Sequence, residues 1–311
     1  MTDRDAGRPT LLCIGRVYCD LVFRGLPNLP RLGEEVFADA FAITAGGGAF
    51  ITAAHATTLG THAALLARLG TDPISSAIEP ILHGSGIDLR FVERAADAGP
   101  QLTAVMVLGG ERTFLSRRAG TARPATLEAA LHAGGAKRLH IAEVATLAEI
   151  PGLLDQARAT GLSVSLDPSW DDALIRSPDL LDRCAGVDLF MSNAVEARAI
   201  TGCADLDAAG RALAQRFPMV VIKNGADGAV LHHRGLCLSL PAPSGGPVVD
   251  TTGAGDAFNA GFLDVLVAGR GPEDALAQGI ACGSLSIRAV GGAGVRLNPE
   301  AIAALAATVR D

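Results

Sequence analysis

The stretch Asp250-Thr251-Thr252-Gly253-Ala254-Gly255-Asp256-Ala257-Phe258 ends an extended segment and begins a helix, and it decides how the rest of the chain is interpreted. The residues that follow, to about Gly269, place apolar side chains at helical spacing. The first N–H groups of a helix lack intrahelical partners and lie at the positive end of its dipole, and glycines there let the backbone approach an anion closely. We therefore predict an anion-binding turn formed by the N–H groups of Gly253, Ala254 and Gly255.

Asp256 follows this turn directly. A carboxylate beside a phosphate is unfavourable unless it has a chemical task, and deprotonating the hydroxyl that attacks the phosphate is such a task. The alternative is a helix N-terminus in which small residues serve packing and the acid stabilises the first turn. The first interpretation makes Asp256 a general base.

The composition limits the possible classes of protein. The chain has 311 residues, enough for one large α/β domain, and its net charge of −7 argues against nucleic acid or an anionic membrane surface as a partner. Its six cysteines form no Cys-x-x-Cys pair and mostly lie in apolar runs, so we expect neither a disulfide framework nor a zinc site. The polar N-terminus does not resemble a signal peptide and no apolar run is as long as a membrane span, so we expect a cytosolic protein.

Strand and helix patterns alternate along most of the chain. Short apolar runs predict buried strands at 11–15, 63–69, 138–142, 162–166, 187–191 and 219–223. Helices are predicted at 49–59, 146–160, 194–201 and 205–216, after Asp72-Pro73, and from Pro272 and Pro299. This alternation predicts a mainly parallel sheet covered by helices on both faces.

Two segments depart from that alternation. Residues 35–41 are strand-like, and the runs 103–108 and 112–115 flank Gly109-Gly110 as in a hairpin, with no helix between them. We predict a small antiparallel lid sheet built from about 16–45 and 88–118. An apolar face on such a sheet often pairs with a copy of itself, which agrees with the homodimer that the family resemblance given below mainly implies.

Polar residues after two strands are candidates for metal and nucleotide binding, because ligands of open α/β sheets lie beyond the carboxyl ends of the strands. Asn193 and Glu196 follow one strand within a single helical turn, and an amide and a carboxylate there can hold the water molecules around Mg²⁺. The alternative is a helix cap. No Gly-x-x-x-x-Gly-Lys-Ser/Thr loop is present, so a P-loop kinase is excluded, and no Gly-x-Gly-x-x-Gly follows the first strand.

The stretch at 250–258 resembles the signature Asp-Thr-x-Gly-Ala-Gly-Asp of the PfkB family of carbohydrate kinases, which are ribokinase-like. The resemblance covers about residues 10–300 and includes the family's Asn-x-x-Glu motif at 193–196. It implies a single ribokinase-like domain over 1–311, a three-layer α/β/α sandwich with a β lid. The implied activity is transfer of the γ-phosphoryl group of ATP, with Mg²⁺, to a hydroxyl of a small carbohydrate.

The resemblance also implies roles for further residues. Lys223, Gly225 and Gly228 match positions along the nucleotide, and Ser284 lies in a segment similar to the adenine side. Asp250 and Thr252 match ligands of a monovalent cation such as K⁺; the alternative is a turn stabilised by the Asp250 side chain.

On the acceptor side, Asp20 resembles the family's sugar-binding acid and Gly46-Gly47 its glycine pair, while Glu143 is a candidate for a further hydroxyl contact. Ile51 replaces the family's usual asparagine and cannot form a hydrogen bond through its side chain. The acceptor is therefore less polar there, or bound through neighbours such as Thr52.

Three alternatives remain open. A nucleoside kinase needs an aromatic pocket, for which Phe50, Phe114 and Trp170 are candidates. A phosphosugar kinase needs basic residues near the acceptor, and the candidates are Arg16, Arg112, Arg117 and Arg118. The third is a binding protein without turnover, which the intact Asp256 argues against.

Overall fold

The computed structural model describes residues 10–108, 111–244, 246–289, 291–294 and 296–310. Its main sheet has nine strands in the order β13-β12-β11-β10-β9-β8-β1-β4-β5. The strands from β5 to β11 run parallel, and β12 and β13 continue the sheet as an antiparallel edge. The bounds are β1 Leu11–Ile14, β4 Ala63–Leu69, β5 Val92–Arg94, β8 Arg138–Ile141, β9 Ser163–Leu166, β10 Leu189–Asn193, β11 Met219–Lys223, β12 Ala229–His233 and β13 Leu236–Leu240. The predicted mainly parallel sheet is confirmed.

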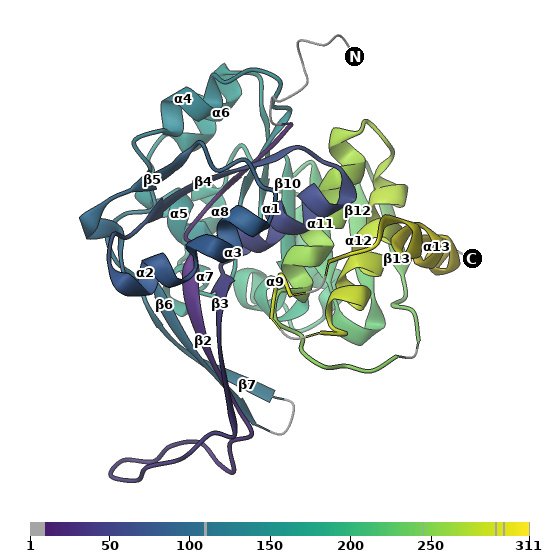
Figure 1. Ribbon diagram of the computed structural model, residues 1–311. Helices are drawn as coiled ribbons and strands as arrows, with labels where there is room; N and C mark the ends of the chain where they lie inside the picture. Colours follow the sequence, from purple (N-terminus) through teal and green to yellow (C-terminus); the bar gives the residue numbers. More distant parts are fainter. Residues whose placement is uncertain (1–9, 109–110, 245, 290, 295, 311) are drawn as a thin grey trace.

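Helices cover both faces of this sheet and form two apolar cores (Figure 1). Side chains alternate along a strand, so β1 directs Leu11 and Cys13 into one core and Leu12 and Ile14 into the other. The first core is closed by α1 Gly48–Leu59, α2 Pro73–Ala77, α3 Glu79–Gly84, α11 Ala254–Val267, α12 Pro272–Ser286 and α13 Pro299–Arg310. The second is closed by α4 Leu127–Leu131, α5 Val144–Glu149, α6 Leu153–Ala159, α7 Asp172–Ile175, α8 Leu180–Arg183, α9 Ala194–Thr201 and α10 Leu206–Ala214.

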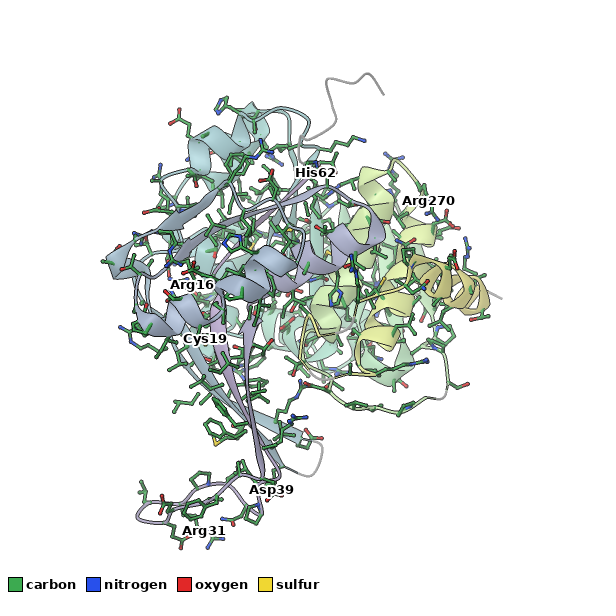
Figure 2. The ribbon with its side chains drawn as sticks, in the orientation of Figure 1. Arg16, Cys19, Arg31, Asp39, His62 and Arg270 are labelled. Carbon is green, nitrogen blue, oxygen red and sulfur yellow. The ribbon has the colours of Figure 1, made fainter. Side chains whose placement is uncertain are left out.

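A second sheet projects from the body as a lid (Figure 1). It has the order β3-β2-β6-β7, with β2 Tyr18–Arg24, β3 Ala40–Gly46, β6 Leu102–Leu108 and β7 Glu111–Arg117. Figure 2 shows Arg31 and Asp39 at its far end and Cys19 near its base. The β2–β6 pair is parallel and the other two pairs are antiparallel, so the lid is only partly the antiparallel sheet we expected.

The structure corrects three boundaries. The strand predicted at 35–41 begins only at Ala40. Residues 92–94 pair with β4 in the main sheet, so the lid segment starts later than residue 88. The helix predicted at 146–160 is interrupted, because Pro151 cannot continue it and Gly152 adopts a φ of 77°. The predicted hairpin turn Gly109-Gly110 lies outside the described residues.

Two compositional expectations can also be compared with the structure. All six cysteines are free, as expected. Within the described ranges, no helix combines the length and the apolar character needed to cross a bilayer.

Helix α1 lies between two glycines with positive φ. Gly47 precedes it with a φ of 97°, and a Cβ atom there would lie 2.2 Å from the backbone oxygen of Arg16. Gly60 ends the helix with a φ of 103°, and a Cβ atom there would meet no atom within 4 Å. A side chain at Gly47 would therefore cause both backbone strain and a steric clash, whereas a side chain at Gly60 would cause backbone strain alone.

We predict that Gly47→Ala lowers the free energy of unfolding more than Gly60→Ala. The Gly60 substitution costs only the left-handed backbone, about 1–2 kcal/mol. The Gly47 substitution adds a clash with backbone that cannot move aside, so we expect a total on the order of 3 kcal/mol or more. Urea denaturation of both variants measures the difference, and equal losses would contradict this account of how α1 begins.

Candidate active site

A cavity of about 680 Å³ lies where the lid meets the body. It is lined by residues of both parts: Arg16, Tyr18, Asp20, Gly47, Gly48, Ala49, Ile51, Thr103, Phe114, Ser116, Arg118, Ala142, Glu143, Ser169, Trp170, Thr252, Gly253 and Asp256. Asp20, Gly47, Glu143, Thr252, Gly253 and Asp256 among them are candidates from the sequence. The fold therefore gathers the predicted base, turn and acceptor residues around one space.

Glycines make room for the two acids of this cavity. A Cβ atom at Gly46 would lie 2.0 Å from Oδ2 of Asp20, and one at Gly48 would lie 2.9 Å from Oδ1 of Asp256. The run Gly46–Gly48 thus lets two carboxylates lie directly against the backbone before α1. The sequence analysis missed the part played by Gly48, although the third consecutive glycine was the signal.

A glycine turn precedes α11 at the position where we predicted an anion-binding turn, and its anion-binding role stays a prediction. Gly253 has a φ of 71° and precedes the helix, and a Cβ atom there would lie 2.6 Å from the Cα of Gly292. The N–H of Ala254 donates to the carbonyl of Thr251 at 3.3 Å. The N–H groups of Gly253 and Gly255 have no acceptor among the described residues, so they are free to bind an anion.

The residues before this turn bind the lid. Oδ1 of Asp250 accepts hydrogen bonds from the N–H and the hydroxyl of Thr252 at 2.8 and 2.6 Å, and Oδ2 accepts from the N–H of Gly291 at 2.8 Å. Arg112 on β7 donates to Asp250 at 2.9 Å and also to the hydroxyls of Thr251 and Thr252. The side-chain-stabilised turn that we considered as an alternative is therefore formed, and Arg112 attaches the lid to it.

A buried cluster lies under the anion turn. Nζ of Lys223 is 2.5 Å from Oδ2 of Asp167 and 3.2 Å from Oδ1 of Asn259, whose Nδ2 lies 2.6 Å from the same Asp167 oxygen. A Cβ atom at Gly255 would lie 3.4 Å from this ammonium group. Lys223 thus supports the turn from below, whereas we expected it to contact a nucleotide.

The cluster sets the charge of the neighbouring acids. Burial and the charge of Asp167 raise the pKa of Asp256 to about 7, although the Lys223 ammonium acts in the opposite direction. Burial and the charge of Asp167 raise the pKa of Glu196 to about 7 in the same way. Burial lowers the pKa of Lys223, but the nearby carboxylates outweigh it and the net direction is upward.

Asn193 and Glu196 form the helix cap that we considered as an alternative. Oδ1 of Asn193 accepts from the N–H of Glu196 at 2.9 Å, and Oε2 of Glu196 accepts from the N–H of Asn193 at 2.8 Å. Oε1 of Glu196 makes no hydrogen bond to a described residue. One carboxylate oxygen therefore remains for a water molecule.

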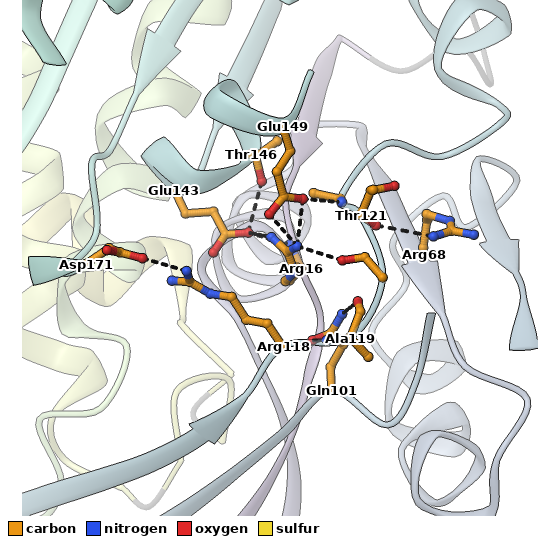
Figure 3. A network of polar contacts seen from close by, with 12 residues as sticks. Arg16, Arg68, Gln101, Arg118, Ala119, Thr121, Glu143, Thr146, Glu149 and Asp171 are labelled. Atoms are coloured by element: carbon orange, nitrogen blue, oxygen red, sulfur yellow. Dashed lines mark hydrogen bonds and ion pairs between the residues drawn. The ribbon is translucent and has the colours of Figure 1, made fainter. Parts of the chain in front are cut away.

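The acceptor end of the cavity contains a dense polar network (Figure 3). Arg16 contacts Glu143 at 3.3 Å and Glu149 at 2.6 Å and donates to the carbonyl of Gly120. Arg118 contacts Asp171 at 2.5 Å. Glu143 therefore lines the cavity as a partner of Arg16, and its contact with an acceptor hydroxyl stays a prediction.

Asp20 and Thr52 differ in their access to the cavity. Asp20 lines it, and burial raises the pKa of this carboxyl to about 7 against the lowering effect of the Thr103 hydroxyl. Thr52 is fully buried and donates to the backbone carbonyl of Asp256 at 3.3 Å. The suggestion that Thr52 replaces the missing asparagine is therefore wrong.

The predicted nucleotide-side residues lie outside this cavity. Gly225 and Gly228 form the turn between β11 and β12, where a Cβ atom at Gly228 would lie 2.0 Å from the carbonyl oxygen of Leu240. Ser284 lies on α12, next to Gly283, which packs against the carbonyl of Ala254. Their nucleotide role stays a prediction.

Sequence reasoning missed Asp167 and Asn259. Asp167 follows β9 directly, so the rule that ligands lie beyond strand ends could have selected it. Asn259 lies one helical turn after Asp256 inside α11, and nothing in the sequence distinguishes it from a surface amide.

Known proteins match this chain along nearly its whole length. Residues 8–298 match the family described as pfkB family carbohydrate kinase. The chain is 30% identical to the bifunctional protein HldE of Aeromonas salmonicida over 308 residues, covering 91% of this chain and 62% of that protein. It is 28% identical to the cytidine kinase of Thermococcus kodakarensis, covering 84% of this chain and 93% of that one.

The fold is also found among solved structures. The ribokinase of Arabidopsis thaliana, solved with ribose and ATP, superimposes with a TM-score of 0.82 at 23% identity, covering 96% of this chain and 99% of that one. With the family match over nearly the whole chain, this protein belongs to the PfkB family of carbohydrate kinases, phosphotransferases that act on alcohol groups.

Proposed function

We propose that this protein transfers the γ-phosphoryl group of ATP to a hydroxyl group of a small carbohydrate. The observation that carries the proposal is that Asp256, Gly253 and Asp20 line one cavity. A base, an anion-binding turn and a hydroxyl-binding acid are the three groups that such a transfer needs. They come from α11 and from the lid, so the cavity is complete only when the lid is in place.

Asp256 is proposed to accept the proton of the attacking hydroxyl. Its pKa of about 7 suits this role, because a carboxyl group of that acidity is about half ionised near neutral pH and its ionised form binds a proton well. The free N–H groups of Gly253 and Gly255 then face the charge that develops on the transferred phosphoryl group. Asp20 and Glu143 orient the acceptor through its other hydroxyls.

The residues near Glu196 fit Mg²⁺ bound through water. The charge of Asp167 raises the pKa of both Glu196 and Asp256, and the charge of Asp256 also raises that of Glu196, so a divalent cation would relieve the repulsion among these carboxylates. The oxygen Oε1 of Glu196, which makes no hydrogen bond to a described residue, is proposed to hold one of the water molecules around the ion. When bound, Mg²⁺ supplies positive charge to the phosphate oxygens.

A monovalent cation such as K⁺ at Asp250 and Thr252 stays a prediction. The oxygens that would bind it are acceptors for Arg112 in this structure, so the ion and the lid arginine share ligands. Nucleotide binding along Asn193, Lys223, Gly225, Gly228 and Ser284 is likewise proposed from the family resemblance. For Lys223 we propose an indirect role, because its ammonium group is used by Asp167 and Asn259.

The phosphosugar alternative is not favoured by the arginines that we considered. Arg16, Arg112 and Arg118 each pair with a carboxylate, and Arg117 donates to the backbone carbonyl of Pro100. Another phosphate on the acceptor would have to displace one of these partners.

A cytosolic location is proposed from the free cysteines alone.

The first prediction concerns catalysis. Asp256→Asn removes the base and keeps the shape, so kcat should fall by about a thousandfold or more while ATP still binds. A coupled assay of ADP release gives kcat, and calorimetry gives the affinity for ATP. A kcat within about threefold of the wild-type value corresponds to a change of less than ~1 kcal/mol in the activation barrier, and it would remove Asp256 from the mechanism.

The second prediction concerns pH and stability. The pKa of Asp256 in the folded chain, about 7, exceeds the ordinary value of 3.8, so the folded state holds a proton that the unfolded state releases between these values. This group therefore makes the free energy of unfolding fall as pH rises from about 4 to about 7. The Asp256→Asn variant lacks this titrating group. Its free energy of unfolding, taken relative to that of the wild type, should therefore rise by roughly 1–2 kcal/mol from pH 5 to pH 8.

Urea denaturation at the two pH values measures this difference. Asp155→Asn, on the exposed side of α6, controls for the substitution itself. If the difference in free energy of unfolding between Asp256→Asn and the wild type does not change with pH, the pKa of Asp256 is not raised in the folded state.

The third prediction concerns assembly. Phe41, Ile43 and Leu115 are 53, 44 and 70% exposed and lie on the lid face opposite Asp20, as strand alternation requires. We propose that two copies pair through this face. Leu115→Glu should raise the dimer dissociation constant by about tenfold or more, because a buried unpaired carboxylate is costly.

Light scattering after size-exclusion chromatography measures the assembly. Val195→Glu, at an exposed position on α9 away from the lid, is the control. A wild type that is monomeric at all concentrations would contradict the proposal.

A further inference from the structure

Arg112 reaches from the lid to the turn that precedes α11. It lies near the start of β7, and its guanidinium group is 2.9 Å from Oδ1 of Asp250. The same group donates to the hydroxyls of Thr251 and Thr252. One lid side chain thus binds three consecutive residues directly before Gly253, at the edge of the cavity that Thr252 and Gly253 line.

Asp250 carries a negative charge in this position. Burial raises the pKa of its carboxyl group, but hydrogen bonds from Thr252 and Gly291 and the charge of Arg112 outweigh burial, so the net direction is downward. The Asp250 side chain is 10% exposed and that of Arg112 is 16% exposed, so the ion pair is only weakly screened by solvent. A charged carboxylate with so little access to water requires a cation as its partner.

The oxygens available to a monovalent cation are the ones that Arg112 uses. Oδ1 of Asp250 accepts from the N–H and the hydroxyl of Thr252 as well as from Arg112, and Oδ2 accepts from the N–H of Gly291. The Thr252 hydroxyl also accepts from Arg112. With the lid in this position, the described residues do not fit an additional cation at these oxygens, because the ion would have to displace the guanidinium group.

The shape of the guanidinium group suits this place. Its planar fork carries five N–H donors, and here it binds a carboxylate and two hydroxyls at once. Its carbon atom lies 5.9 Å from the centre of the Phe114 ring on the same strand, a favourable contact between a cation and an aromatic face. The lid therefore presents a positive charge that is already oriented toward the turn.

Asp250 connects this charge to the glycine turn. Its Oδ1 holds the N–H of Thr252, directly before Gly253, and its Oδ2 holds the N–H of Gly291. Gly292 packs against the turn from the other side, since a Cβ atom at Gly253 would lie 2.6 Å from the Gly292 Cα. A balanced charge at Asp250 therefore stabilises both segments that enclose the turn.

We infer that Arg112 takes the place of a monovalent cation at the anion turn, so that the lid, and not a dissolved ion, supplies the positive charge beside Asp250. The ion that the family resemblance implies would then bind only where Arg112 is absent. Because Arg112 is carried by β7, the turn has this charge only while the lid covers the cavity. Arg112 is thus a positioning residue for the proposed phosphoryl transfer, on which the inference rests.

The first arm of the test needs no turnover. It compares thermal unfolding of the full-length wild type, Arg112→Ala and Arg117→Ala in potassium chloride and in tetramethylammonium chloride at equal ionic strength. Tetramethylammonium has the same charge as K⁺ but is too bulky to enter among converging oxygens. K⁺ should raise the Tm of Arg112→Ala by about 2 °C or more relative to tetramethylammonium, because it binds the vacated oxygens in the folded state alone.

Arg117→Ala is the matched control for this arm. Arg117 lies on the same strand, donates to the carbonyl of Pro100 and does not line the cavity. The two salts should change the Tm of this variant and of the wild type equally, by less than about 1 °C, because Arg112 fills the site in both.

The second arm measures turnover of an acceptor that the wild type phosphorylates. Arg112→Ala should lose about tenfold or more of its kcat/KM in tetramethylammonium chloride and regain about threefold or more in potassium chloride, since a hydrogen bond between charged groups contributes at that level. The wild type should differ by less than about twofold between the salts. Arg112→Lys should also be insensitive to K⁺, because its ammonium group supplies the charge from the same strand.

Two results would overturn the inference. One is a wild type that depends on K⁺ as strongly as Arg112→Ala does, and the other is an Arg112→Ala variant that responds to K⁺ no more than Arg117→Ala. Arg112→Gln serves in both arms if Arg112→Ala does not fold. A wild type that phosphorylates no acceptor in either salt would end the proposed function, and the thermal arm would still decide whether Arg112 takes the place of the ion.

Discussion

The close approach of two helix N-termini is the constraint on which the site depends. Helices α1 and α11 begin beside one another, and the carboxylate of Asp256 fills the space that a side chain at Gly48 would need. Asp20 of the lid fills the equivalent space at Gly46. Because both acids lie against backbone at glycines, their positions follow from how α1 and α11 start and how β3 ends, not from a flexible surface loop.

The second organising feature is one lysine among several acids. Lys223 is the cation of a buried group that includes Asp167, Glu196 and Asp256, and it pairs directly only with Asp167. Burial, together with the charge of Asp167, raises the pKa of Asp256 and of Glu196 to about 7, and the one ammonium group of Lys223 does not offset this. Near neutral pH these two carboxyl groups therefore hold part of their protons, and an added cation would reduce the repulsion among the carboxylates.

Much of this arrangement could be predicted from the sequence, because it is encoded locally. The run 250–258 fixes the start of α11, and apolar runs fix the strands of the parallel sheet. What could not be predicted depends on partners distant in sequence. Pairing of residues 92–94 with β4 is such a case, and so are the contacts of Lys223 with Asp167 and Asn259, 56 and 36 residues away. The interruption at Pro151 was visible in the sequence and was overruled by the helical pattern around it.

Ile51, which stands where the family usually has asparagine, lies both behind the anion turn and at the cavity. Its Cδ1 lies 2.5 Å from where a Cβ atom of Gly292 would be, and its Cγ2 lies 3.1 Å from the corresponding point at Gly253. The isoleucine therefore packs behind the anion turn while it also lines the cavity. An asparagine there could bind hydroxyls of an acceptor, whereas isoleucine supports the turn and contributes only apolar contact. Ile51, Trp170 and Phe114 therefore all present apolar surface to the same cavity, and Trp170 and Phe114 are partly exposed there.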